Sequence, residues 1–279
     1  MTRSRNARSL STWLLSGVMW VTAVLFALPL LWMISASLKR NIDVFTLPVK
    51  WIPDPVRWVN YLDVWAGDPP LLRYFGNSVI VATASVAGEL FTSSLAGYAF
   101  ARLRFKGRDR LFLLYIATSI VPTQLLLVPR FMFFQAVGLY DTLWALILPS
   151  MFTVFGTFLM RQHFSTVPGE FAEAARIDGA GEWSIYWRIY LPMARPVLAA
   201  LAILGFVWSW NSYETPLIML STDENYTLPV GLTRFVDGDG GLAGGLSMAA
   251  ATSSVVPMII VFLVFQRQFL SALSRTGLK

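Results

Sequence analysis

Long runs without charge dominate the chain and alternate with short polar segments. A helix of about 18 or more apolar residues crosses a bilayer, because each residue adds about 1.5 Å against a hydrocarbon core about 30 Å thick. Lipid offers no partners to backbone groups, so each run is expected to be helical. The runs cover residues 9–38, 74–101, 111–129, 142–160, 196–213 and 240–266, with Glu89 as their only charged residue. The pattern predicts an all-α membrane protein with six transmembrane helices.

The basic residues predict the orientation of these helices. If the N-terminus lies inside, 15 of the 22 Lys and Arg residues fall on the inner side, and the densest group lies between Arg102 and Arg110. Inner loops of membrane proteins carry such an excess of Lys and Arg. We therefore expect both termini on the inner side, in an N-in/C-in topology.

Composition agrees with a membrane protein and narrows the function. Charged residues make up 14% of the chain, against about 25% in ordinary globular proteins. The formal net charge is +6, but the excess lies in short loops between spans, which topology explains without a nucleic-acid partner. Membrane lipid is the expected surrounding.

The chain lacks the material for several kinds of chemistry. It has no cysteine, and its single histidine is His163, so we expect no metal site, no cofactor and no nucleophilic catalysis in this chain. It also lacks a G-x-x-x-x-G-K-[ST] phosphate loop. Uphill transport by this chain would draw its energy from a partner protein or from an ion gradient.

The inner loop over residues 161–195 is long and carries a helical pattern. Pro168 and Gly169 end the incoming helix. We expect a short helix over 170–178, a stop at Gly179, and a second helix over 182–190 that ends near Pro192. Such a segment could rest on lipid headgroups, but interfacial helices carry a Lys/Arg-rich polar face. The acidic and alanine-rich composition here favours contact with another protein.

This loop carries a sequence signature. The pattern E-A-A, three residues, G, nine residues, I-x-L-P is present as Glu173-Ala174-Ala175, Gly179, Ile189 and Leu191-Pro192. It resembles the cytoplasmic loop of permeases from binding-protein-dependent ABC importers. The resemblance implies that these residues, with Asp178, couple the permease to an ATPase.

Other segments resemble the carbohydrate-type permeases, and the best match is the second, six-helix permease of maltose-like systems. The C-terminal tail from Ser274 departs from the ending common in that group. The resembling segments are Gly97–Leu103, Gly76-Asn77-Ser78, Leu148-Pro149, Trp210-Asn211, Pro216-Leu217, Leu228–Leu232 and Phe265-Gln266-Arg267.

The resemblance implies a type I ABC importer permease in the bacterial cytoplasmic membrane, forming half of the path for a sugar or related polyol. The implied partners are a second permease, an ABC ATPase dimer that uses ATP and Mg²⁺, and an extracytoplasmic solute-binding protein. We expect residues 1–72 to comprise a cytoplasmic N-terminus, the first transmembrane helix and the first outer loop. Residues 73–268 form the permease core, and residues 269–279 form a cytoplasmic tail.

Four polar residues are candidates for the substrate path, namely Glu89, Asn211, Gln124 and Glu214. An acid at bilayer depth faces the bundle interior, so Glu89 either contacts substrate or is a structural partner of another helix. The alternative function is an ion-coupled secondary transporter that uses Glu89 or Glu214, a class that often shows inverted repeats.

A glycine-rich outer segment is expected to face the binding protein, although a plain linker explains its glycines as well. It comprises Asp237, Gly238, Asp239, Gly240 and Gly241.

Overall fold

The computed structural model describes residues 3–68, 70–236 and 244–276, and every regular element within them is helical. Within these residues, four helical segments are long and apolar enough to cross a membrane: Leu15–Ser37, Leu71–Arg102, Trp144–Thr166 and Gly244–Gln266. Two further pairs are bent, by 89° and 74°, and bring the number to six if each pair is one span. The all-α class is confirmed, while the count of six and the N-in/C-in topology stay predictions.

The chain forms two compact units, which are described separately. The first comprises residues 1–71 and 232–256 and contains α1 (Arg3–Ser37), α2 (Val59–Ala66) and the start of α14 (Gly244–Thr276). Two asparagine side chains form hydrogen bonds between its segments. The amide of Asn60 donates to the carbonyl oxygens of Ser37 and Lys39, each over 2.8 Å. The side-chain oxygen of Asn41 accepts from the backbone N–H of Gly245 over 3.0 Å. Side chains thereby satisfy backbone carbonyls at the end of α1 and a backbone N–H at the start of α14, which have no partner within their helices.

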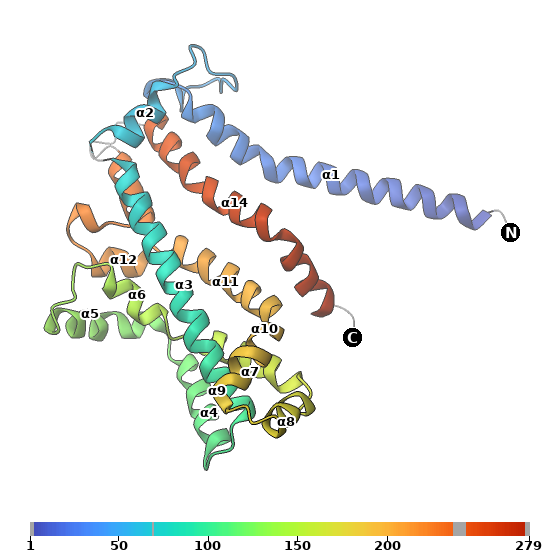
Figure 1. The fold of residues 1–279 in the computed structure, drawn as a ribbon. Helices are drawn as coiled ribbons and strands as arrows, with labels where there is room; N and C mark the ends of the chain where they lie inside the picture. Colours follow the sequence, from blue (N-terminus) through green and yellow to red (C-terminus); the bar gives the residue numbers. More distant parts are fainter. Residues whose placement is uncertain (1–2, 69, 237–243, 277–279) are drawn as a thin grey trace. The chain divides into compact units, whose positions relative to one another are not determined.

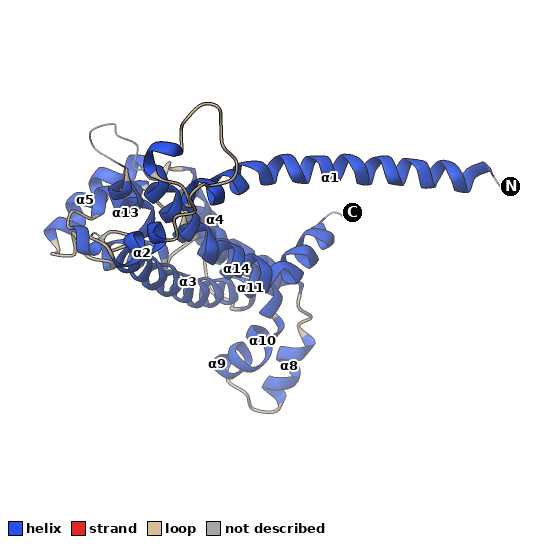
Figure 2. Cartoon of the chain, turned by 90° about the horizontal axis from the view of Figure 1, so that it is seen from above, coloured by secondary structure: helices blue, strands red, loops and turns tan. Residues whose placement is uncertain are grey.

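The second unit comprises residues 72–231 and 257–279 and contains most of the helices (Figure 1). Its longest element is α3, and α8, α9 and α10 gather beside the end of α3 that carries Arg102 (Figures 1 and 2). The elements are α3 (Leu71–Arg102), α4 (Arg108–Ala117), α5 (Leu127–Ala136), α6 (Trp144–Ser150), α7 (Val154–Thr166), α8 (Glu170–Ile177), α9 (Glu182–Ile185), α10 (Leu191–Met193), α11 (Arg195–Trp210), α12 (Glu214–Met219) and α13 (Leu228–Gly231).

The run over residues 111–129 was expected to be one helix and is broken instead. The chain bends by 89° between Arg108–Ile120 and Thr123–Ala136. Val121 at the bend is extended, with φ −73° and ψ 116°, because the residue before a proline disfavours the helical region. Pro122 then lacks the N–H that would continue the helix.

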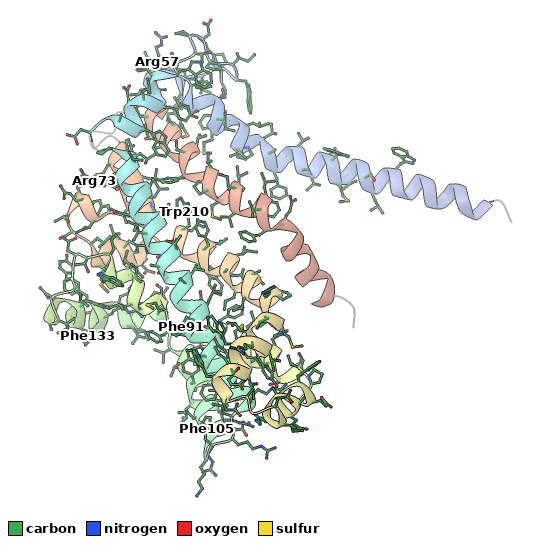
Figure 3. The ribbon with its side chains drawn as sticks, viewed as in Figure 1. Arg57, Arg73, Phe91, Phe105, Phe133 and Trp210 are labelled. Carbon is green, nitrogen blue, oxygen red and sulfur yellow. The ribbon has the colours of Figure 1, made fainter. Side chains whose placement is uncertain are left out.

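Large apolar side chains remain exposed on the second unit, as expected for helices that face lipid. Phe91 on α3 is 53% exposed and Phe133 on α5 is 60% exposed (Figure 3). A soluble monomer rarely leaves so much apolar surface open. This surface is consistent with a membrane around the unit.

Asp141 joins two connecting segments of the second unit. Its Oδ1 accepts from the backbone N–H groups of Ser221 and Thr222, over 2.8 and 3.1 Å, and its carbonyl accepts from Asn225 over 2.6 Å. Its φ of +59° is left-handed, which Asp tolerates better than most residues. Burial raises the pKa of the Asp141 carboxyl, but the hydrogen bonds outweigh burial and hold the pKa below its ordinary value.

Replacing Asp141 by alanine should lower the stability of the protein by about 1.5–3 kcal/mol, the range for hydrogen bonds to a charged group. Asp141→Asn keeps an acceptor oxygen and tolerance of the left-handed backbone, so it should cost less. Because the folded-state pKa is depressed, the carboxylate stabilises the fold above its unfolded-state pKa, and this contribution is lost as the pH falls through the folded value. Thermal unfolding in detergent, compared between pH 7 and a pH well below the ordinary aspartate pKa of 3.8, measures both effects. Equal melting temperatures for wild type and Asp141→Ala at pH 7 would contradict the assignment.

Candidate functional site

The segment that carries the sequence signature forms a helical hairpin, here defined as residues 168–193. Its first arm is α8; its second arm is α9, a π-helical segment over Tyr186–Tyr190, and α10. The two expected helices are confirmed, with α8 ending one residue earlier than expected, at Ile177. The π-helical turn was not expected. It precedes Pro192, whose ring would clash with the carbonyl four residues earlier in a regular α-helix.

Gly179 ends α8 as the sequence predicted. Its φ is +81°, a conformation that costs other residues about 1–2 kcal/mol. The N–H of Gly179 donates to the carbonyl of Arg176 over 3.0 Å, and the N–H of Ala180 donates to that of Ala175 over 2.9 Å. This pair of bonds is a Schellman motif, which satisfies the last carbonyls of the helix and turns the chain back.

Four aromatic rings attach the hairpin to the body of the second unit. Tyr98 of α3 lies 5.3 Å from Tyr186, 5.2 Å from Tyr190 and 6.1 Å from Phe164 of α7, centroid to centroid. All four are at most 4% exposed. We call these four residues the aromatic cluster. Edge-to-face and tilted pairs of this kind each contribute about 0.5–1.5 kcal/mol beyond their area, so the hairpin is held firmly against α3 and α7.

Three members of the signature pack inward against this cluster. They are half-buried, and they are Ala175, Ile189 and Leu191. The exposed members are Glu173, Ala174, Asp178 and Gly179, while Pro192 is half-buried. The signature therefore contains residues that hold the hairpin in place and residues that remain available to a partner.

Charged groups add to the attachment. The Glu182 carboxylate accepts from Arg176 of α8 over 2.8 Å and from the Tyr98 hydroxyl over 2.8 Å. Arg102 at the end of α3 donates to the carbonyls of Phe164 and Val167. Its guanidinium lies 5.0 Å from the centre of the Tyr190 ring. The two arms of the hairpin are thereby joined to each other and to α3.

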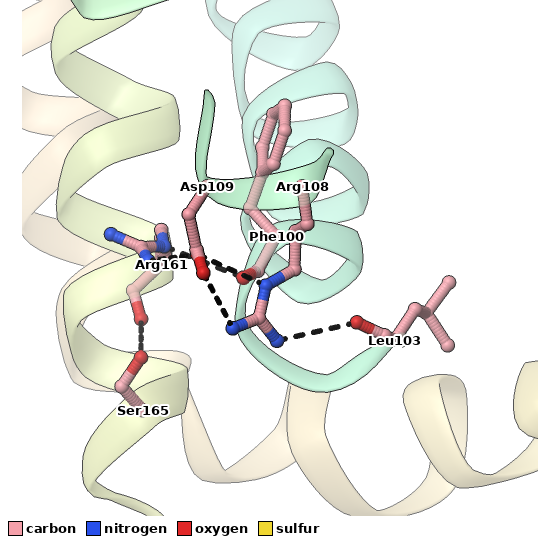
Figure 4. Close-up of polar contacts among 6 residues, drawn as sticks. All are labelled: Phe100, Leu103, Arg108, Asp109, Arg161 and Ser165. Carbon is pink, nitrogen blue, oxygen red and sulfur yellow. Dashed lines mark hydrogen bonds and ion pairs between the residues drawn. The ribbon is translucent and has the colours of Figure 1, made fainter. Parts of the chain in front are cut away.

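The basic segment near residues 102–110, which was assigned only to orientation, also makes contacts. Asp109 of α4 accepts from Arg161 of α7 over 3.3 Å and from Arg108 over 3.1 Å (Figure 4). The Arg161 guanidinium also lies 3.9 Å from the centre of the Phe112 ring. These contacts fix the α3–α4 turn against α7, beside the hairpin.

The exposed surface of the hairpin is apolar as well as acidic. Ile177 is 87% exposed, Trp183 is 62% exposed and Trp187 is 53% exposed. The two tryptophan rings stack, with centroids 6.2 Å apart. Sequence reasoning missed this pair, although a spacing of four residues places side chains together on a helix. The pair enlarges the surface that is available to a partner.

A second feature of the unit is a cavity of about 250 Å³. Its lining residues come from α3, α5, α6, α11, α12 and their connections: Val81, Ser85, Glu89, Arg130, Leu146, Pro149, Ser150, Thr153, Gly205, Trp208, Ser209, Ser212, Thr215, Pro216 and Thr227. We call it the polar cavity, because ten of these side chains carry a polar or charged group or an indole N–H.

Glu89 lies in this cavity and is 3% exposed. The Thr153 hydroxyl donates to its Oε1 over 2.6 Å. A Cβ at Gly205 would lie 2.4 Å from its Oε2, so glycine at that position leaves room for the carboxylate. Glu89 therefore has a hydrogen-bond partner at the start of another helix and also lines a cavity, while its contact with substrate stays a prediction.

The other expected path residues do not line the polar cavity. Asn211 is exposed and donates to the carbonyl of Val207 over 2.8 Å. Gln124 and Glu214 are also exposed. Residues 237–241, expected to face a binding protein, lie outside the described residues. The roles of all these residues stay predictions.

Sequence reasoning missed most of the polar cavity. Ser85 could have been found, because it lies four residues before Glu89 on the same helix. Arg130, Trp208 and Thr227 come from distant segments, and no local pattern joins them to Glu89. Within the described residues, no group of three or more His, Cys, Asp or Glu side chains could hold a metal ion.

Comparisons with known proteins agree with these features. The family model described as the binding-protein-dependent transport system inner membrane component matches residues 90–275. The arabinooligosaccharides transport system permease protein AraQ of Halalkalibacterium halodurans is 34% identical over 99% of each chain. The sn-glycerol-3-phosphate transport system permease protein UgpE of Yersinia enterocolitica is also 34% identical, over 92% of this chain and 94% of that protein.

The fold has a solved counterpart as well. A chain from a bacterial ABC transporter involved in the import of the acidic polysaccharide alginate superposes with a TM-score of 0.81 at 24% identity. The match covers 96% of this chain and 98% of that chain, and the likeness supports the type I ABC importer permease fold. The chain belongs to the family of inner membrane components of binding-protein-dependent transport systems.

Proposed function

We propose that this chain is the membrane-spanning permease subunit of an ATP-driven importer for a sugar or related polyol. The observation that carries the proposal is the hairpin, which presents an exposed acidic and aromatic surface and is attached to α3 by buried rings. A surface held in this way can pass a displacement to a membrane helix. The chain forms half of the translocation path and performs no covalent chemistry.

The proposed partner at the hairpin is an ABC ATPase dimer on the cytoplasmic side, which binds ATP and Mg²⁺. The exposed carboxylates of Glu173 and Asp178 would meet basic groups of the ATPase, and Trp183 and Trp187 would fill an apolar depression. ATP-driven closure of the ATPase would move the hairpin, and α3 would move with it. The proposed N-in/C-in topology places the hairpin on that side.

The other proposed partners are a second permease, which completes the path, and an extracytoplasmic solute-binding protein. Among the relatives, AraQ is named for arabinooligosaccharides and the GanQ protein of Bacillus subtilis, 30% identical, is named for galactooligosaccharides. Such ligands are rich in hydroxyl groups. The ion-coupled alternative has no support from these relatives, which are named as transport system permease proteins. The family model that matches this chain describes binding-protein-dependent systems.

The full importer, reconstituted with its second permease, ATPase and binding protein, should accumulate sugar only when ATP is supplied. Uptake of a labelled panel of arabinotriose, galactotriose, diacetylchitobiose and sn-glycerol 3-phosphate into proteoliposomes measures this dependence. Accumulation driven by a proton or sodium gradient without ATP would contradict the proposal and support the ion-coupled alternative.

Charge at Glu173 should control the contact with the ATPase. Glu173→Lys reverses the charge at an exposed position, so it should reduce binding-protein-stimulated ATP hydrolysis more than tenfold while the chain still inserts into the membrane. Glu173→Gln keeps the shape and removes the charge, so an intermediate loss is expected. Stimulated hydrolysis at the wild-type rate in Glu173→Lys would count against the hairpin as the ATPase contact.

The backbone at Gly179 should matter, and Gly181 supplies a matched control. A Cβ meets nothing within 4 Å at either position, but φ is +81° at Gly179 and −75° at Gly181. Gly179→Ala should therefore destabilise the hairpin by about 1 kcal/mol and reduce stimulated hydrolysis, whereas Gly181→Ala should leave both near wild type. Hydrogen exchange over residues 168–193 measures the local stability. Equal exchange in the two variants would show that the left-handed turn is unimportant.

A further inference from the structure

The polar cavity contains hydroxyl groups that the fold leaves unsatisfied. Ser85 and Thr227 are each 3% exposed and line the cavity. Neither hydroxyl has a hydrogen-bond partner among the described residues. A buried hydroxyl without a partner costs free energy, and a ligand that carries its own hydroxyl groups would offset that cost. The unsatisfied groups therefore point to a ligand rather than to packing alone.

The charges of the cavity favour an uncharged ligand. Glu89 supplies a carboxylate whose Oε1 already accepts from Thr153, which leaves Oε2 to accept from a ligand hydroxyl. Arg130 also lines the cavity and carries the opposite charge. A phosphate or carboxylate would approach Arg130 but would meet Glu89 in the same small volume, so an anion would gain little.

The size and the walls of the cavity limit the ligand further. Its volume of about 250 Å³ lies below the range of about 300–1,000 Å³ for sites that hold drug-sized ligands. One sugar ring fits this volume better than a whole oligosaccharide. The Trp208 side chain lines the same cavity and offers an aromatic wall beside hydroxyl groups, the combination of apolar and polar surface that small-ligand sites use.

We propose that the polar cavity binds one uncharged sugar ring of the transported ligand. Glu89 and Arg130 supply its two charged groups, the Ser85 and Thr227 hydroxyls bond to ring hydroxyls, and Trp208 forms a wall. The proposal rests on the proposed function and adds to it, because it places a sugar site within this permease half. Gly205 is a positioning residue, since a side chain there would displace the Glu89 carboxylate.

The absence of cysteine from the chain allows a direct test. In the complete importer, Ser209→Cys places a unique thiol of this chain in the cavity wall, and Ser212→Cys is a second such position. Maleimide labelling of this subunit is compared with binding protein that is empty or loaded with arabinotriose or galactotriose. We expect the loaded binding protein to slow labelling at least about threefold, and to lose this protection when Glu89→Gln and Thr227→Val are added.

Transport gives a second readout with a matched control. Thr227→Val and Ser85→Ala each remove an unsatisfied hydroxyl that lines the cavity. Ser93→Ala removes a buried hydroxyl of α3 that also lacks a partner among the described residues but does not line the cavity. At saturating binding protein, the double variant Ser85→Ala/Thr227→Val should reduce the maximal uptake rate about tenfold, equivalent to about 1.4 kcal/mol. Ser93→Ala should leave that rate unchanged.

The outcomes separate this proposal from the proposed function. If ATP-driven sugar uptake is intact but neither cysteine is protected, and the double variant matches Ser93→Ala, the sugar site is wrong and the importer function stands. Protection by sn-glycerol 3-phosphate but not by neutral sugars would also overturn the assignment to an uncharged ring. If no ATP-driven uptake of any panel member occurs, the proposed function fails, and the sugar site fails with it.

Discussion

The contact between Tyr98 and the two hairpin tyrosines is the interaction on which the account of this protein depends. It is buried, it joins segments about 90 residues apart in sequence, and it is reinforced by the hydrogen bond from Tyr98 to Glu182 and by the contacts of Arg102. Interiors packed in this way transmit displacement because they deform little. In the proposed function, the hairpin therefore moves as an extension of α3 rather than as a separate loop.

The same helix carries the polar cavity's acid. Glu89 precedes Tyr98 by nine residues, which is about 14 Å along a helix. A movement of the hairpin would therefore reach the cavity through one continuous element. It would change the distance between Glu89 and groups on other segments, such as Arg130 of α5 and Thr227 before α13. Coupling of this kind requires an element with two arrangements that both sites bias, and α3 with the hairpin is that element in the proposed function.

Much of this arrangement could be predicted from sequence, because local patterns determine it. Charge-free runs predicted the helices, and Gly179 predicted the end of α8 because a left-handed residue favours glycine. The bend at Pro122 could be foreseen as a kink but not as an angle of 89°, which depends on packing against neighbours. Ala175, Ile189 and Leu191 were recognised as part of a signature, yet their sequence does not reveal that they face inward.

The polar cavity was the least predictable feature, since its walls come from segments between residues 81 and 227. Glu89 could be singled out as an acid within a span, but its neighbours could not. Asn211 was predicted as a path residue from its chemistry, and the sequence did not reveal that its amide donates to the carbonyl of Val207 on its own helix. Spacing along a chain predicts which residues share a helix face, and it does not predict which helix faces meet.

The most direct test of the central claim is a distance measurement within this subunit. Spin labels at Ile177→Cys on the hairpin and Phe91→Cys on α3 report whether the two move together, and both positions are exposed. Pulsed electron–electron double resonance on the complete importer measures the distance between the two labels in the nucleotide-free and ATP-bound states. The account predicts the same distance in both states, together with a change between Phe91 and a label on the second permease. A hairpin-to-α3 distance that differs between the two states would contradict it.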